Sequence, residues 1–248
     1  MAGTANSTDQ PTWVTIDIVC VGDEPMLCNP MSRDQLVAIA EKRPVAWPAD
    51  RPVIEQADVK AELMRDTDGH YGFPRQWLQG ALREAGRSVP TGKAARQMIS
   101  TATSTRLRTL VRIDPVCLSF NADGERFIRF SSHSEYERDV RKGVGGNAAK
   151  PVAVAIVRPL FRNWAFRVRI QASTSIDTSR IRELFEIAGA SQGLGDFRPG
   201  KGGEFGCFQV ASLVKYDDPA EVPEFVLATN AMTAADNGQG KVHELAST

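Results

Sequence analysis

The chain has 248 residues, of which 42% are hydrophobic and 24% are charged. This composition is typical of a globular protein and excludes a wholly disordered or a fibrous chain. Thirty Lys and Arg residues balance 30 Asp and Glu residues, so the formal net charge gives no general affinity for polyanions. No apolar run approaches the about 20 residues of a membrane-spanning helix, and the polar start lacks a signal-peptide pattern. We therefore expect a cytoplasmic protein without a membrane partner.

The charges are distributed unevenly along the chain. The stretch from His70 to Gln171 contains 18 Lys and Arg residues but only 7 Asp and Glu residues, whereas the two flanks together contain 12 and 23. A local excess of positive charge is typical of a surface that binds a polyanion, and it also arises when solvated charges simply segregate. A nucleic-acid contact is therefore sought first in this stretch.

Both ends of the chain are polar and lack an apolar period. We expect flexible tails at residues 1–11 and 217–248, the second of them extended. Residues 12–216 are expected to form a single domain with insertions at about 43–70, 88–105 and 131–150.

The first half of this domain predicts one strand and two helices. Trp13 to Val21 alternates apolar and polar residues, which is typical of a strand. Arg33 to Glu41 predicts a short helix, and the proline-rich stretch Arg43 to Arg65 predicts an irregular insertion. Pro74 to Ala85 predicts a long helix, because its apolar residues share one face and Gly86 follows.

Strands dominate the middle of the chain. Arg106 to Phe120 and Arg126 to Phe130 predict strand regions on either side of a turn. The apolar run Val152 to Val157 predicts a central strand. Trp164 to Gln171 alternates most clearly, so that one face is apolar and the other is basic.

A second helix and a last strand complete the pattern. Ser179 to Ala188 predicts the helix, and Phe205 to Val214 predicts the strand. In order, the main elements predict a β-α-β-β-α-β core of the α+β class, the ferredoxin-like or RRM-like arrangement. Two helices then cover one face of an antiparallel sheet and leave the opposite face free for a partner.

The cysteines and histidines predict neither a metal site nor a cofactor. Cys20, Cys28, Cys117 and Cys207 form no C-x-x-C pair and are expected to be reduced and mostly buried. The three histidines show no spacing typical of a zinc ligand pair.

A glycine-rich loop precedes the last strand. Gly193 to Gly206 contains six glycines in fourteen residues, together with Arg198 and Lys201. Glycine allows positive φ and the close approach of a ligand, and backbone amides beside two cations can hold a phosphate. The loop is not a P-loop or a Rossmann fingerprint, because G-x-x-x-x-G-K-[ST] is absent and the glycines precede a strand. A flexible surface hairpin is the alternative interpretation.

A ferredoxin-like core with a glycine-rich loop between its second helix and its last strand resembles the RAMP superfamily of CRISPR-associated RNA-binding proteins. The layout is also similar to uncharacterised phage and mobile-element proteins, through Pro25-Met26-Leu27, Gly72-Phe73-Pro74 and Gly193 to Phe208. The resemblance covers roughly Trp13 to Val214, and only the loop is a sharp motif.

In that superfamily, the backbone subunits of effector complexes hold guide RNA by its sugar-phosphate chain. The resemblance therefore implies single-stranded RNA or DNA as the partner, with RNA favoured, and self-association or other subunits of a ribonucleoprotein. It implies binding without catalysis, on one groove that joins the basic face of the sheet, the basic insertions and the loop. The residues expected to contact nucleic acid are Arg158, Arg162, Arg167, Arg169, Gly193, Gly195, Arg198, Lys201, Gly202, Gly203, Lys93 and Arg96.

Two alternatives stay open. The neutral net charge and the acidic flanks favour a protein–protein interaction module of phage or mobile-element origin. Some members of the superfamily are metal-independent endoribonucleases with a histidine as general base, which makes His70, helped by Tyr71, the candidate catalytic residue. His133 is a weaker candidate.

Overall fold

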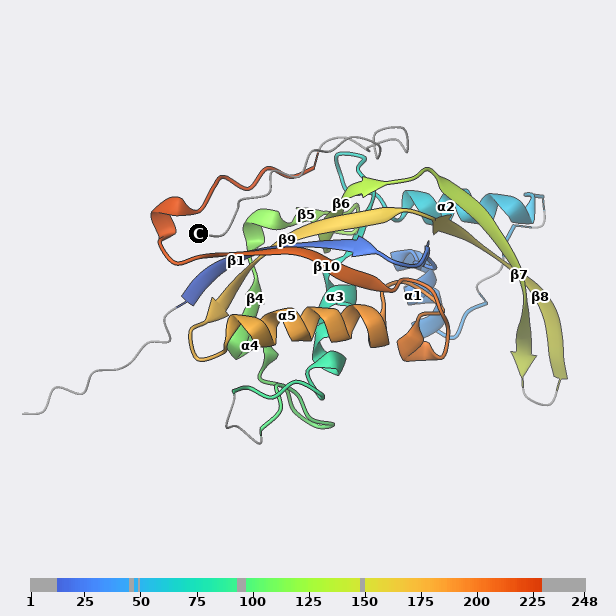
Figure 1. Cartoon of the computed structure of the whole chain (residues 1–248). Helices are drawn as coiled ribbons and strands as arrows, with labels where there is room; N and C mark the ends of the chain where they lie inside the picture. Colours follow the sequence, from blue (N-terminus) through green and yellow to red (C-terminus); the bar gives the residue numbers. More distant parts are fainter. Residues whose placement is uncertain (1–12, 45–46, 49, 93–96, 148–149, 229–248) are drawn as a thin grey trace, which may run out of the picture.

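The computed structural model describes residues 13–44, 47–48, 50–92, 97–147 and 150–228 (Figure 1). Lys93 and Arg96 lie outside the described residues. The main sheet is built on four long strands: β1 (Trp13–Gly22), β6 (Arg126–His133), β9 (Trp164–Ser173) and β10 (Phe208–Tyr216). Their order is β10-β1-β9-β6, and every neighbouring pair is antiparallel.

The two long helices lie on one face of this sheet (Figure 1). They are α3 (Arg75–Ala85), which follows the first strand of the core, and α5 (Thr178–Ile187), which precedes the last. With β1, β6, β9 and β10 they complete a β-α-β-β-α-β arrangement whose outer strands are the second and the fourth. The predicted α+β, ferredoxin-like fold is confirmed.

The core forms where the apolar faces of the strands meet the helices. Ile16 and Ile18 of β1 and Phe166 and Val168 of β9 are fully buried, because the period of two directs them to the helix side. Phe185 of α5 packs into the same core. All of the predicted buried faces of these elements are therefore found.

Shorter elements surround the core. Three short strands extend the main sheet: β3 (Gly72–Pro74) and β5 (Ser119–Phe120) pair with β6, and β4 (Val111–Ile113) pairs with β9. The short helices are α1 (Arg33–Ala40), α2 (Gln56–Glu62) and α4 (Leu107–Leu110). The predicted strand region Arg106 to Phe120 is thus only partly a strand, because it opens with α4. No helix in the described part of the chain is long and apolar enough to cross a bilayer.

The predicted insertion at 131–150 is a strand for most of its length. Tyr136–Asn147 forms β7, which pairs over twelve residues with β8 (Lys150–Phe161). With β2 (Met26–Leu27) these strands make a second antiparallel sheet, and the hairpin extends away from the main one (Figure 1). The sequence of β7 lacks a regular apolar alternation, and for this reason the strand was missed.

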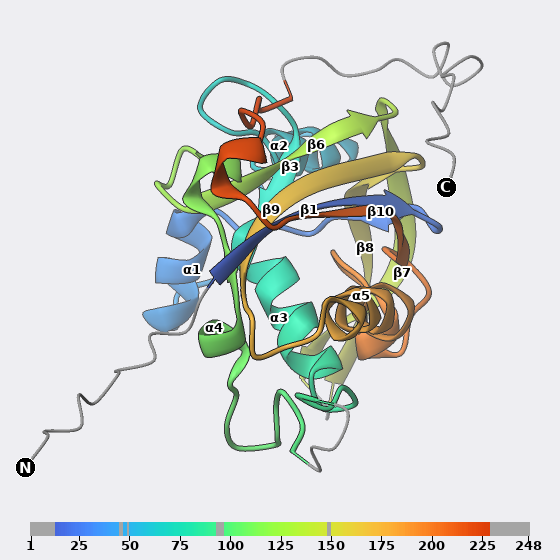
Figure 2. The same ribbon diagram turned by 60° about the vertical axis from the view of Figure 1, so that its left-hand side comes forward.

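The face of the main sheet opposite the helices is covered in part, around Asp17, Arg167 and Arg169, which corrects the prediction that it is free. Residues 217–228, which we call the C-terminal strap, cross this face as the red segment of Figures 1 and 2. Phe225 of the strap is buried, with the guanidinium groups of Arg167 and Arg169 4.6 and 5.2 Å from its ring centroid. Arg169 also donates to the carbonyl of Pro223, and Arg129 to that of Ala228. The first part of the predicted flexible tail is therefore packed.

Acid is expected to destabilise the fold through Asp17. Burial by itself raises the pKa of Asp17, but hydrogen bonds from Arg169 and Arg167 outweigh it, and the net pKa lies below its ordinary value. A carboxylate with a lowered pKa stabilises the folded state above its unfolded pKa of about 3.9, and this contribution is lost as the pH falls through the folded pKa. Thermal unfolding between about pH 5 and 2 should show this loss, and Asp17→Asn should show a flatter pH dependence.

Candidate functional site

The two arginines on the sheet face are committed to a carboxylate of the neighbouring strand. Asp17 lies directly opposite Arg169 in the β1–β9 ladder. Arg169 donates to both of its oxygens, at 2.6 and 2.9 Å, and Arg167 donates to Oδ2 at 2.5 Å. Asp17 is 5% exposed and Arg169 is 4% exposed. The Arg169 guanidinium is therefore not accessible to a phosphate, and the Arg167 guanidinium is only partly accessible.

The two arginines of the β8–β9 region are also paired. Arg158 is buried and contacts Asp196 at 2.8 Å and Asp139 at 3.3 Å. Arg162 is exposed and donates to both carboxylate oxygens of Glu137, at 2.5 and 2.8 Å. An exposed pair of this kind contributes little to stability and exchanges readily for another anion, whereas a buried one does not.

The glycine-rich loop lies on the helix side of the sheet. The turn of π-helix Ala188–Gln192 leads from α5 into it and packs against α3. The loop then docks on the segment after β1, where Asp196 N–H donates to Leu27 O at 2.7 Å. Arg198 donates to Gln192 O, and Lys201 is exposed. The loop therefore does not meet Arg167 and Arg169, which occupy the opposite face, and the expected single groove is not formed.

The geometry of the loop itself accounts for its glycines. Gly193, Gly195 and Gly202 have φ values of 65°, 81° and 77°, in the left-handed region that favours glycine. A Cβ on Gly203 would lie 1.8 Å from Phe197 O. These four predicted contact residues are thus explained by a compact turn, without a ligand.

Gly206 offers a direct test of this structural role. Its φ is 71°, and a Cβ there would lie 1.8 Å from Leu194 O. Gly206→Ala is expected to destabilise the fold by well over 1 kcal/mol, because the strain of positive φ adds to a backbone overlap. Gly124→Ala is the matched control, since Gly124 has a φ of 76° and open space around it. If urea unfolding gave equal losses of the free energy of unfolding for the two variants, the structural role of Gly206 would be contradicted.

His70 lies in an acidic turn that an arginine closes. Asp66, Asp68 and His70 have ligand atoms within 4.8 Å of one another, a spacing that suits a metal ion. Arg129, however, donates to both Asp66 and Asp68 and supplies the positive charge there. The cluster is thus explained as the counter-charge of a buried guanidinium.

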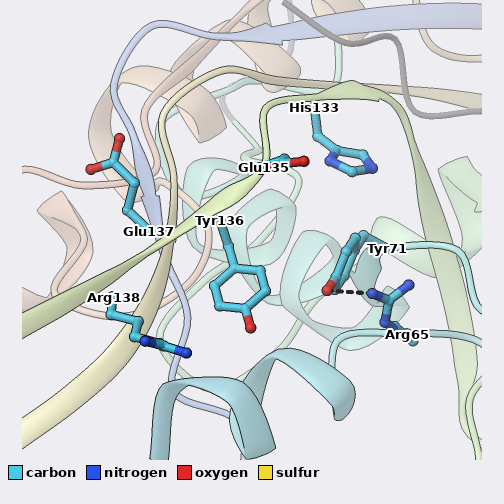
Figure 3. A pocket seen from close by; sticks show the side chains of 7 residues that line it. All are labelled: Arg65, Tyr71, His133, Glu135, Tyr136, Glu137 and Arg138. Atoms are coloured by element: carbon cyan, nitrogen blue, oxygen red, sulfur yellow. Dashed lines mark hydrogen bonds between the residues drawn. The ribbon is translucent and has the colours of Figure 1, made fainter. Parts of the chain in front are cut away.

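Tyr71 lies instead in a cleft of about 620 Å³, which Figure 3 shows from close by. The cleft lies between the segment after α2 and the start of the β7–β8 hairpin. Tyr71 O–H accepts a hydrogen bond from Arg65 at 2.6 Å, and the ring of His133 lies 5.3 Å from the Tyr71 ring. The residues that line the cleft are Arg65, Tyr71, His133, Glu135, Tyr136, Glu137 and Arg138.

His133 is held in one tautomer. Its Nδ1 lies 2.8 Å from Ser134 O, and a carbonyl only accepts, so Nδ1 carries the hydrogen. Burial lowers the pKa of His133, which keeps the ring neutral at neutral pH and leaves Nε2 as an acceptor. The structure thus brings His133, rather than His70, to the cleft of Figure 3.

Three arginines that form no ion pair among the described residues lie elsewhere. Arg75 at the start of α3 lies close to Arg108 of α4 and Arg126 of β6, and burial together with these two charges lowers the pKa of Arg75. None of the ion pairs formed by the described residues, within 4.0 Å, involves any of the three. We call them the arginine cluster.

The arginine cluster borders a groove between α3 and α4, the pair of helices seen side by side in Figure 2. The groove has a volume of about 440 Å³, and Arg83 and Arg108 line it. Phe120, which is 51% exposed, lies opposite Arg126 in the β5–β6 ladder, so the two side chains share a face. The excess of positive charge in residues 70–171 was the sequence signal for this site. It could not identify the cluster, because the segments that carry Arg75, Arg108 and Arg126 are far apart in the sequence.

Comparison with known proteins gives a distant structural match. No family model matches the chain, and no curated protein matches it in sequence. Among solved structures, a chain in the cryo-EM structure of the Type III-B Cmr-beta bound to cognate target RNA matches with a TM-score of 0.43 and 10% identity. The match covers 82% of this chain and 60% of that chain, so this chain spans less than two thirds of its length. The assignment of the fold rests on the strand order and not on this match.

Proposed function

We propose that this protein binds single-stranded nucleic acid by its backbone, without cleaving it. The observation that carries the proposal is the arginine cluster, where the charges of Arg126 and Arg108 act on Arg75 and none of the three forms an ion pair among the described residues. Mutual repulsion makes such a cluster unfavourable until an anion neutralises it. RNA is favoured over DNA by the resemblance of the core and its loop to the RAMP superfamily.

The groove beside the cluster suits a single strand. Leu107, Val111 and Ile113 line the groove but are buried, and Phe120 offers an exposed ring beside Arg126. Cations that follow a backbone, with an aromatic ring on which a base stacks, are the usual means of binding a single strand without reading its sequence. Arg162 and Lys201, which stay exposed, are further possible phosphate contacts among the residues expected from the sequence.

The affinity should depend strongly on salt. Each phosphate neutralised on a single strand contributes about −0.7 to the slope of log K against log salt, so three contacts predict a slope of about −2. Fluorescence-anisotropy titrations of a labelled oligouridylate at several NaCl concentrations measure it. Absence of binding at low salt would end the proposal.

Binding without cleavage is part of the proposal. The same RNA, incubated with the protein and run on a denaturing gel, is expected to stay intact. Cleavage that is lost in His133→Ala but kept in His70→Ala would overturn the proposal. The protein would then be an endoribonuclease with His133 in the cleft as its general base. That outcome would also fit the free Nε2 of His133 beside Arg65.

A protein–protein interaction module is the second candidate, because of one apolar surface. Leu36 and Ile39 of α1 are 53% and 52% exposed, and Met31 and Val59 are exposed beside them. Ile39, Met31 and Val59 line a depression of about 340 Å³ between α1 and α2. Contiguous apolar patches of this kind mark interaction sites. Leu36→Asp with Ile39→Asp, followed by light scattering, would reveal a self-associating surface as a loss of mass.

A further inference from the structure

We propose that the cleft of Figure 3 is a guanine-binding pocket, which holds one base of the strand that the arginine cluster grips. This inference deepens the proposed function by naming the base that is bound. It rests on the proposed function for the presence of a bound strand, but not for the pocket itself. The cleft is large enough for a nucleotide, since pockets for small molecules span about 300–1,000 Å³.

Aromatic rings form much of the cleft wall. Tyr71, His133 and Tyr136 line it, and the rings of Tyr71 and Tyr136 lie 6.2 Å apart at 69°. Tyr136 O–H is held by Asp58 at 2.7 Å, which fixes the ring. A base that leaves the stack is commonly held against such rings and recognised by its Watson–Crick edge.

Glu135 supplies the acceptor that selects the base. It is exposed, forms no ion pair among the described residues, and directs its carboxylate toward the imidazole of His133 (Figure 3). Guanine alone among the four RNA bases presents two adjacent donors, N1–H and N2–H, on its Watson–Crick edge, and a carboxylate accepts both. The Nε2 acceptor of His133 lies on the same side of the cleft and suits the second N2 hydrogen.

The opposite side of the cleft supplies a donor. The Tyr71 hydroxyl oxygen accepts from Arg65, so its own hydrogen is available, and Arg65 is itself held by Glu62 and the Gly69 carbonyl. The Tyr71 hydroxyl hydrogen suits the O6 acceptor of guanine. Adenine, cytosine and uracil each place an acceptor where Glu135 has only acceptors, so they leave the carboxylate unpaired or repelled.

The cleft and the arginine cluster are joined by one strand. Arg126 begins β6 and His133 ends it, which places the two sites roughly 23 Å apart at about 3.3 Å per residue. A strand of several nucleotides that lies on the arginine cluster can therefore place one base in the cleft.

Two measurements test the pocket separately from the strand. Calorimetric titration of the full chain with free GMP, AMP, CMP and UMP tests the pocket alone, and GMP is expected to bind at least about tenfold more tightly than the others. Anisotropy with oligouridylates that carry a single guanosine tests the base within a strand, and the guanosine is expected to raise affinity by a similar factor.

Glu135→Gln is the decisive variant, because it replaces one acceptor oxygen with a donor and keeps the size. It should abolish the preference for GMP and for the guanosine. Glu186→Gln is the matched control, since Glu186 lies on α5, pairs with Arg182 and does not line the cleft. Equal affinity for the four nucleotides, or loss of the preference in both variants, would overturn the pocket. A preference for GMP without binding of oligouridylate would support the pocket and contradict the proposed function.

Discussion

Asp17→Ala is expected to destabilise the protein by about 3–5 kcal/mol, because it leaves the Arg169 guanidinium buried without its carboxylate. After the substitution, the described partners of that guanidinium are the Pro223 carbonyl and the Phe225 ring. The strap should loosen together with the pair, since Arg169 contacts both the Pro223 carbonyl and the Phe225 ring. Urea unfolding followed by circular dichroism measures the loss of free energy.

An exposed ion pair gives the control for this expectation. Arg182 and Glu186 form an exposed pair on α5 at 3.5 Å, so Glu186→Ala should change the free energy of unfolding by less than about 1 kcal/mol. A loss for Asp17→Ala no larger than that of the control would show that the Asp17 pair is solvated. The conclusions that this sheet face is buried and that Arg169 cannot contact a ligand would then be wrong.

The same pair shows what the sequence could and could not predict. The alternation of Trp164 to Gln171 correctly placed Arg167 and Arg169 on the face away from the helices. Periodicity says which face a side chain takes, but it does not say what covers that face. Asp17, a charge in the middle of an apolar strand, was the overlooked signal, because a buried carboxylate requires a partner.

Two other differences have the same origin. The strap was predicted as a tail because its sequence has no apolar period, yet Phe225 packs into the core and Arg169 and Arg129 donate to strap carbonyls. The glycine-rich loop was correctly placed before the last strand. Its glycines, however, are required by close approaches to the backbone of Leu194 and Phe197 inside the loop, and not by a ligand. Local composition predicted where these segments lie and not what they pack against.

The cleft and the arginine cluster could not be predicted from local pattern at all. Arg75, Arg108 and Arg126 come from three elements that are placed by strand pairing: β3 before Arg75 pairs with β6, which Arg126 begins, and β4 after Arg108 pairs with β9. The charge excess of residues 70–171 pointed to the right stretch but counted paired and unpaired arginines alike. Only the structure separates the committed cations from the available ones.

Arg108→Glu with Arg126→Glu is expected to weaken RNA binding by about 100-fold at low salt, since each charge-assisted hydrogen bond contributes about 1.5 kcal/mol. The slope of log K against log salt should become shallower by about 1.4, because two phosphate contacts are lost. Neither guanidinium has an ion pair to lose, so the free energy of unfolding should change little. Anisotropy titrations and urea unfolding of the same preparation measure both.

Arg180→Glu with Arg182→Glu is the matched control, because it changes the net charge equally on α5, where Glu183 and Glu186 pair with these arginines. If affinity depended only on net charge, both double variants would lose it equally, and the arginine cluster would have no special role. If the cluster is the site, the α5 variant keeps the original salt slope. The distinction is sharp because the chain as a whole is neutral, so any strong attraction of a polyanion has to come from a local group of uncompensated charges.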